Sequence, residues 1–106
     1  RQAALLAFSA FSELKHVFLV DEDVDCFDLK DVIWAMNTRM QGDADIITIP
    51  GVRCHPLDPS NDPSCSPSIR DHGIACKTIF DCTVPYDQKE RFKRARFMEV
   101  DPEKWL

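Results

Sequence analysis

Blocks of apolar and polar residues follow one another along the first half of the chain, and each block predicts one element. Residues 2–14 carry apolar side chains at helical spacing, with Ser9, Ser12 and Glu13 facing outward, which predicts an amphipathic helix. Residues 16–20 form an unbroken apolar run that is too short for a helix, so we expect a buried strand in the centre of a sheet. The buried side of the first helix is expected to be Leu5, Phe8, Phe11 and the neighbouring alanines.

A second helix is predicted after an acidic turn. Asp28 can accept hydrogen bonds from the free N–H groups at the helix start, and Asp31 adds a carboxylate to the first turn. Gly42 can adopt the left-handed conformation that ends a helix. The face expected to pack on the strand of residues 16–20 is Leu29, Val32, Ile33, Met36 and Met40.

The remaining elements complete an α/β pattern. Residues 45–49 predict a second strand ended by Pro50 and Gly51, and residues 76–82 predict a third. A short helix should follow Pro85 and bury Phe92 and Phe97, and Trp105 should anchor the tail. Strand, helix and strand in this order predict a right-handed parallel crossover. We therefore expect one small three-layer α/β domain over residues 1–106, with a mostly parallel sheet.

Two segments should lie beyond the carboxyl ends of parallel strands, where such sheets bind ligands. They are residues 21–25 and residues 51–58, which we expect side by side. Residues 52–73 carry four prolines and predict a long irregular loop that is either functional or disordered. Ile69 and Ile74 are expected to anchor this loop.

Composition narrows the function classes. The net charge of −5 argues against nucleic acid or an anionic membrane as the main partner. The basic stretch of residues 89–96 is interpreted as a solvated helix face, with a phosphate-binding patch as the alternative. Five cysteines without CxxC spacing favour a reducing, cytoplasmic compartment. The first residues are interpreted as a helix and not as a secretory signal, and the absence of an initial Met suggests a piece of a longer protein.

The candidate metal sites fail on spacing. Asp21, Asp23 and Asp25 alternate as in a calcium-binding EF-hand, but the required Gly and Glu fall on Cys26 and Val32. A structural role for these carboxylates in the turn is therefore preferred. Thiol and imidazole groups that could bind zinc also match no common spacing; they are Cys54, His55, Cys65, His72 and Cys76.

His55 is the residue that best fits a role at a ligand site. It follows the second predicted strand and is flanked by Arg53 and Pro56, so its backbone is stiffened. An imidazole there could donate to a substrate hydroxyl or move a proton near neutral pH. The alternative is an ordinary histidine of a surface loop.

The sequence contains the blocks VDEDVDCFDLKDVIWAMNTRMQGDADIITIPG, HPLDPS and KTIFDCTVP. Together these three blocks resemble the C-terminal domain of UbiD-like decarboxylases. The resemblance is nearer to the branch that acts on hydroxylated benzoates such as protocatechuate, gallate, vanillate and 4-hydroxybenzoate. It implies a carboxy-lyase of aromatic acid metabolism that is reversible, non-oxidative and oligomeric. Prenylated FMN, Mn²⁺ and K⁺ would be bound mainly by a domain absent from this chain.

The resemblance also implies what this domain does. It would close over the active site, contribute to subunit contacts of a homo-oligomer, and be catalytically incompetent alone. His55 and Leu57 match the positions that line the substrate pocket in that family, and no catalytic or metal-binding residue of the family falls in this chain. A non-catalytic assembly module derived from the same domain is the alternative.

Overall fold

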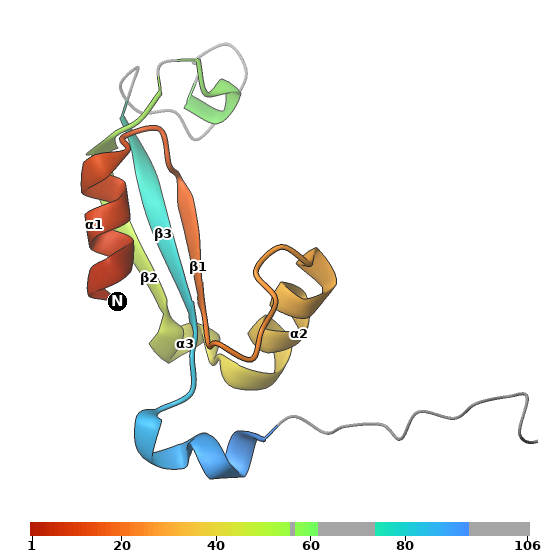
Figure 1. Ribbon diagram of the computed structural model, residues 1–106. Helices are drawn as coiled ribbons and strands as arrows, with labels where there is room; N and C mark the ends of the chain where they lie inside the picture. Colours follow the sequence, from red (N-terminus) through yellow and green to blue (C-terminus); the bar gives the residue numbers. More distant parts are fainter. Residues whose placement is uncertain (56, 62–73, 94–106) are drawn as a thin grey trace, which may run out of the picture.

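The fold is a small α/β domain built on one three-stranded sheet (Figure 1). It was obtained as a computed structural model, which describes residues 1–55, 57–61 and 74–93. The expected α/β class with helices on both faces of a sheet is confirmed. The elements in chain order are α1 (Gln2–Ala10), β1 (His16–Val20), α2 (Leu29–Arg39), α3 (Gly42–Asp45), β2 (Ile46–Arg53), η1 (Pro59–Asn61), β3 (Ile74–Cys82) and η2 (Tyr86–Phe92).

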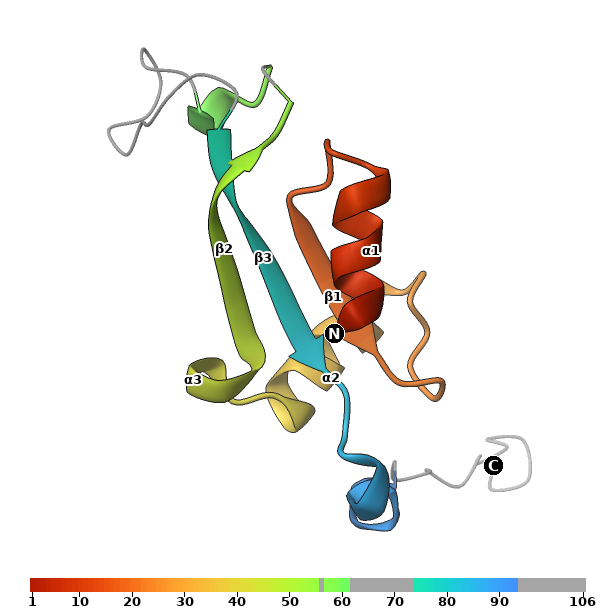
Figure 2. The ribbon, with the colours of Figure 1, turned by 90° about the vertical axis from the view of Figure 1, so that its left-hand side faces the viewer.

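The sheet has the order β1-β3-β2, so the central strand is β3 and not β1. β1 runs parallel to β3, with Val20 opposite Cys82, whereas β2 runs antiparallel to β3, from Ile46 opposite Phe80 to Arg53 opposite Ile74. The sheet is therefore mixed, and the predicted parallel crossover from β1 to β2 is wrong. Because α2 lies beside the end of the sheet where β1 finishes, the chain re-enters the sheet at that same end (Figures 1 and 2).

One face of the sheet is covered by α1 (Figure 2). Ala4 and Phe8 of α1 form a buried cluster with Ile79 of β3. The predicted helix exists but ends at Ala10, so Phe11 is 55% exposed, and Leu5 is 48% exposed on the outer side. The expectation that these two side chains are buried is wrong, because the shorter helix turns a narrower face toward the sheet. The partly buried residues on this cluster are Leu14, Val17, Leu19, Ile47 and Ile49.

A lysine lies in the middle of this covered face. Lys77 of β3 is 1% exposed, and its Nζ donates to the carbonyl oxygen of Ser12 at 2.7 Å. The same ammonium lies 5.2 Å from the ring centroid of Phe8. Burial of this charge is offset by the carbonyl just beyond the C-terminal end of α1, where the helix dipole is negative, and by the aromatic ring.

The opposite face is covered by α2 at one end only. Ala35 of α2 and Val24 pack on Cys82. Asp28 caps the helix as predicted, accepting from the Lys30 N–H at 3.0 Å. Val32 is buried, but Leu29 and Ile33 of the expected packing face are 74% and 41% exposed; that part of the prediction is wrong because α2 meets only the end of the sheet. The residues that pack around this second cluster are Val20, Trp34, Met36, Met40 and Phe80.

The rest of this face carries a pair of stacked aromatic rings that is partly exposed to solvent. Phe18 stacks on Phe80 with ring centroids 4.5 Å apart, and Phe18 is 40% exposed. His16 meets the edge of the Phe80 ring at 5.9 Å. These three side chains share one face because their register places His16 and Phe18 beside Thr78 and Phe80.

The two turns with glycine differ from the prediction. Gly42 opens α3 and has no positive φ, so it does not end α2; the C-cap of α2 is Met40 in an extended conformation. Gly51 has φ +71° inside a bulge between Ile49 and Val52, and β2 continues through it to Arg53. The third strand is confirmed but begins two residues earlier than predicted, at Ile74. The short helix after Pro85 is confirmed as a 3-10 helix, in which Phe92 is partly buried. Predictions for Cys65, Ile69, His72, Phe97 and Trp105 lie outside the described residues.

Candidate functional site

The two predicted ligand segments lie at opposite ends of the sheet. β1 leads into the acidic turn where Val20 pairs with Cys82, and β2 leads toward His55 where Arg53 pairs with Ile74. These pairs mark the two ends of β3. The expected side-by-side arrangement of residues 21–25 and residues 51–58 is therefore wrong, and its cause is the antiparallel direction of β2.

His55 lies in a compact turn, and the structure orients its ring. The carbonyl oxygen of His55 accepts from the Asp58 N–H at 3.1 Å, and its Nδ1 accepts from the Leu57 N–H at 3.0 Å. An acceptor Nδ1 carries no proton, so the neutral ring bears its proton on Nε2. The His55 side chain is 40% exposed and Leu57 is 80% exposed. His55 therefore presents an accessible N–H donor.

One ion pair and one longer polar contact join this turn to the loop between α1 and β1. Lys15 Nζ lies 2.9 Å from Asp58 Oδ2, and His55 Nε2 lies 3.5 Å from Glu13 Oε1. Asp58 also accepts from the N–H of Ser60 at 3.0 Å. Hydrogen bonds from Lys15 and Ser60 lower the pKa of the Asp58 carboxyl to about 2, so this group remains ionised at neutral pH.

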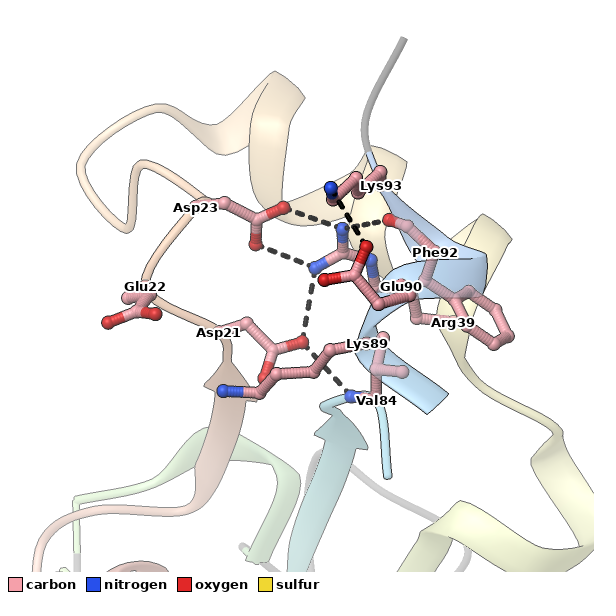
Figure 3. Close-up of a pocket in the computed structure, with 9 residues that line it drawn as sticks. All are labelled: Asp21, Glu22, Asp23, Arg39, Val84, Lys89, Glu90, Phe92 and Lys93. Atoms are coloured by element: carbon pink, nitrogen blue, oxygen red, sulfur yellow. Dashed lines mark hydrogen bonds and ion pairs between the residues drawn. The ribbon is translucent and has the colours of Figure 1, made fainter. Parts of the chain in front are cut away.

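At the other end of the sheet an open pocket of about 620 Å³ lies between the acidic turn, α2 and η2 (Figure 3). Its centre is Arg39, whose side chain is only 3% exposed. Both terminal nitrogens of Arg39 donate to the Asp23 carboxylate at 2.7 Å, and one of them also donates to Asp21 at 3.1 Å. The other nitrogen donates to the Phe92 carbonyl oxygen at 3.1 Å, and the guanidinium lies 5.0 Å from the Trp34 ring centroid.

These contacts give the acidic turn a structural role, as the sequence suggests. The hydrogen bonds that Arg39 donates to Asp23, together with the negative charges of Asp23 and Asp21, raise the pKa of Arg39 above its usual value, although burial acts in the opposite direction. Asp21 accepts from the Val84 N–H at 3.0 Å as well, and thereby ties the end of β1 to the segment after β3. Asp25 accepts from the Phe27 N–H at 3.0 Å. Every aspartate of this turn therefore stabilises local structure.

Arg39 is the residue that sequence reasoning missed. Its place in the last turn of α2, following three aspartates, was the available signal, because a cation is favoured at a helix C-terminus. The side chains of Lys89, Glu90 and Lys93 also line the pocket, and Lys93 pairs with Glu90 at 2.8 Å while both remain exposed. Glu22 points away from the guanidinium (Figure 3). The described part of the basic stretch therefore behaves as a solvated face.

The thiols and imidazoles do not assemble into a metal or nucleophile site in the part of the chain that the structure describes. No group of three or more His, Cys, Asp or Glu residues that could hold a metal ion occurs there. Cys54 is buried, and its Sγ lies 3.6 Å from the carbonyl oxygen of His55, to which it can donate. Cys26, Cys54, Cys76 and Cys82 are all free thiols. Among the described helices, none has the length and apolar character needed to cross a membrane.

Comparison with known proteins identifies relatives of the whole chain. Gallate decarboxylase of Lactiplantibacillus plantarum is 61% identical over 108 residues, covering 100% of this chain and 22% of the relative. The apo structure of 3,4-dihydroxybenzoic acid decarboxylase from Enterobacter cloacae is 64% identical with a TM-score of 0.83, covering 98% of this chain and 21% of that one. The UbiD-class enzyme HmfF from Pelotomaculum thermopropionicum in complex with FMN is 31% identical with a TM-score of 0.77, covering 98% and 22%.

The chain thus spans about a fifth of the length of these relatives. The sequence model of one domain family, described as the 3-octaprenyl-4-hydroxybenzoate carboxy-lyase C-terminal domain, matches residues 1–82. This match covers all three strands of the sheet and both ends of it. The chain belongs to the C-terminal domain family of the UbiD decarboxylases.

Proposed function

We propose that this chain serves as the C-terminal domain of a non-oxidative, reversible decarboxylase of hydroxybenzoate-type acids. The observation that carries the proposal is the 61% identity to gallate decarboxylase along the entire chain. The 64% identity to a 3,4-dihydroxybenzoic acid decarboxylase supports the same substrate class. The domain would close the active site, help select the substrate and contribute contacts to a homo-oligomer in the cytoplasm.

Substrate selection is assigned to the turn at the end of β2. His55 offers an Nε2–H donor that is 40% exposed, and Leu57, two residues on, offers an apolar side chain that is 80% exposed. A donor beside an apolar side chain suits a phenolic ring, whose hydroxyl oxygen accepts while its carbons need an apolar wall. A site that hydrogen-bonds a substrate hydroxyl rejects an analogue without it, because the buried polar group is then unpaired.

The proposed cofactor is prenylated FMN with Mn²⁺ and K⁺, held outside this chain. The UbiD-class relative in complex with FMN supports a flavin. Among the described residues, no group of three or more His, Cys, Asp or Glu side chains is arranged so that it could hold a metal ion. We therefore assign no chemical step to this chain.

The test is replacement of His55 by Ala in the full-length decarboxylase that carries this domain. Turnover of 3,4-dihydroxybenzoate or gallate should fall by roughly tenfold to a hundredfold, since a hydrogen bond to the substrate is lost. His16→Ala is the matched control, because His16 is an exposed histidine of β1 that meets the edge of the Phe80 ring. Equal kinetics of the His55→Ala and parent enzymes would remove His55 from the site.

A non-catalytic assembly module is the second candidate. It is favoured by apolar side chains that stay exposed, including Phe18, which is 40% exposed and stacks on Phe80, and Phe27, which is 97% exposed. Size-exclusion chromatography and flavin titration of the purified chain separate the two functions. The assembly module is favoured if the purified chain forms a defined assembly and supports no decarboxylation when it is combined with the remaining domains of a related decarboxylase. A monomer that binds prenylated FMN tightly would contradict both proposals.

A further inference from the structure

The turn that holds His55 is built by its own hydrogen bonds and then fastened to another part of the chain. We call His55, Leu57, Asp58 and Ser60 the His55 turn. Inside it, Asp58 N–H donates to His55 O, Leu57 N–H to His55 Nδ1 and Ser60 N–H to Asp58 Oδ1, at 3.0 to 3.1 Å. Such a turn has a defined shape, but on its own it would be free to tilt on the end of β2.

Lys15 removes that freedom. Its Nζ pairs with Asp58 Oδ2 at 2.9 Å and also donates to the Ser60 hydroxyl. The pair is partly shielded from water, with the Lys15 side chain 33% and the Asp58 side chain 16% exposed. Shielding makes the attraction stronger than that of an ordinary surface pair.

The anchor is itself fixed to the sheet. The carbonyl oxygen of Lys15 accepts from the Thr78 N–H of β3 at 3.0 Å, and the next residue begins β1. The ion pair therefore connects the His55 turn to the central strand through one side chain. Glu13, two residues before Lys15, lies 3.5 Å from His55 Nε2 and faces the ring from the same loop.

We propose that Lys15 and Asp58 are positioning residues that fix the direction of the His55 Nε2–H donor, and that substrate selection depends on them. The inference rests on the proposed role of His55 and extends it to a pair that does not touch the substrate. Glu13 provides the resident acceptor for the donor, which a substrate hydroxyl would replace. At 3.5 Å this contact is longer than a normal hydrogen bond, so an incoming oxygen can compete for the proton.

The orientation itself is tested on the 106-residue chain by ¹⁵N NMR of the histidine ring nitrogens. The parent should show a protonated Nε2 and an unprotonated Nδ1 for His55, with the signal assigned by its loss in His55→Asn. Lys15→Met and Asp58→Asn should move these shifts toward the average of the two tautomers, and Lys15→Arg should retain them. Lys30→Met, an exposed lysine of α2, is the control and should leave them unchanged.

Substrate selection is tested in the full-length holoenzyme. For Lys15→Met, the ratio of kcat/KM for 3,4-dihydroxybenzoate to that for 4-hydroxybenzoate should fall about tenfold, because a small misplacement of a positioned group is costly. Lys15→Arg should restore most of the ratio. In a His55→Ala background Lys15→Met should have no further effect on it, because the pair acts through the ring.

The outcomes separate the two proposals. If Lys15→Met leaves the His55 ring signals unchanged, or lowers the ratio equally with and without His55, the positioning role is overturned while the role of His55 stands. If His55→Ala leaves the kinetics unchanged, the proposed function of His55 fails and with it the link to selection. The NMR comparison would then still decide whether the ion pair orients the ring.

Discussion

Replacement of Arg39 by Met should lower the free energy of unfolding by about 3 kcal/mol. Arg39 joins α2 to the acidic turn and to η2 through hydrogen bonds to Asp21, Asp23 and the Phe92 carbonyl. Its side chain is 3% exposed, so the guanidinium is desolvated and its loss leaves nearby carboxylates without their partner. Met keeps the apolar stem of the arginine and removes only the charge and its donors.

The magnitude follows from the exposure of each partner. Removing one member of a fully buried ion pair costs about 3–5 kcal/mol. Asp23 is 41% exposed and regains water, so its share is small, whereas Asp21 is 16% exposed and keeps only the Val84 N–H. The lost hydrogen bond to Phe92 adds about 1 kcal/mol. Leaving the largely buried Asp21 carboxylate without the guanidinium costs about 2 kcal/mol. The sum is near 3 kcal/mol and lowers the melting temperature by roughly 10–20 °C in a domain of this size.

The assay is urea denaturation followed by tryptophan fluorescence. Trp34 lies under the guanidinium and reports on this contact directly, and Trp105→Phe in every variant removes the second tryptophan. Arg39→Lys should lose about half as much stability, since an ammonium cannot make the two parallel bonds to Asp23. Lys30→Met is the control for the loss of an exposed cation. The reasoning fails if Arg39→Met is no less stable than this control, or if its effect adds fully to that of Asp23→Asn.

Three further predictions concern other parts of the chain. The pKa of Asp58 is lowered from 3.8 to about 2, so its stabilising contribution is present above about pH 4 and is lost as the pH falls toward about 2. Asp58→Asn should therefore make the free energy of unfolding depend less on pH in this range. An unchanged pH dependence between about pH 4 and about pH 2 would contradict this. Burial raises the pKa of the Cys82 thiol, so thiol reagents should modify exposed Cys26 in the native state and reach Cys82 only on unfolding, as mass spectrometry would show. Lys77→Met should change the free energy of unfolding by less than about 1 kcal/mol, whereas Ile79→Ala should lower it by about 2–5 kcal/mol, both measured by thermal unfolding. A larger loss for Lys77→Met would mean that the contacts of the ammonium contribute more than its desolvation costs.

The local features of the fold could be predicted from the sequence because short-range rules determine them. Asp28 caps α2 through a bond to a residue two positions away, and the apolar run at His16 to Val20 forms a strand wherever the sheet places it. The structural role of the acidic turn was also predicted correctly. The identity of its main partner, Arg39, could not be derived, since 16 residues separate the guanidinium from Asp23.

The sheet order and the direction of β2 could not be predicted because they depend on contacts far apart in the chain. The default of a parallel crossover assumes that the helix returns along the sheet before the next strand begins. Here α2 stays at the end where β1 finishes, so Ile46 enters the sheet beside Phe80 and β2 runs back. His55 was consequently expected at the wrong end, and the partners Lys15 and Glu13 could not be foreseen.

The position of β1 at the rim of the sheet has a practical consequence for handling the isolated chain. One side of this strand faces no other strand within the described residues, so its backbone donors and acceptors there are open to an extended peptide. Phe18, on the same strand, adds an exposed aromatic ring that favours association with other apolar surfaces. Precipitation of the purified chain should therefore begin by strand addition along β1, and a charged residue in place of Phe18 should slow it.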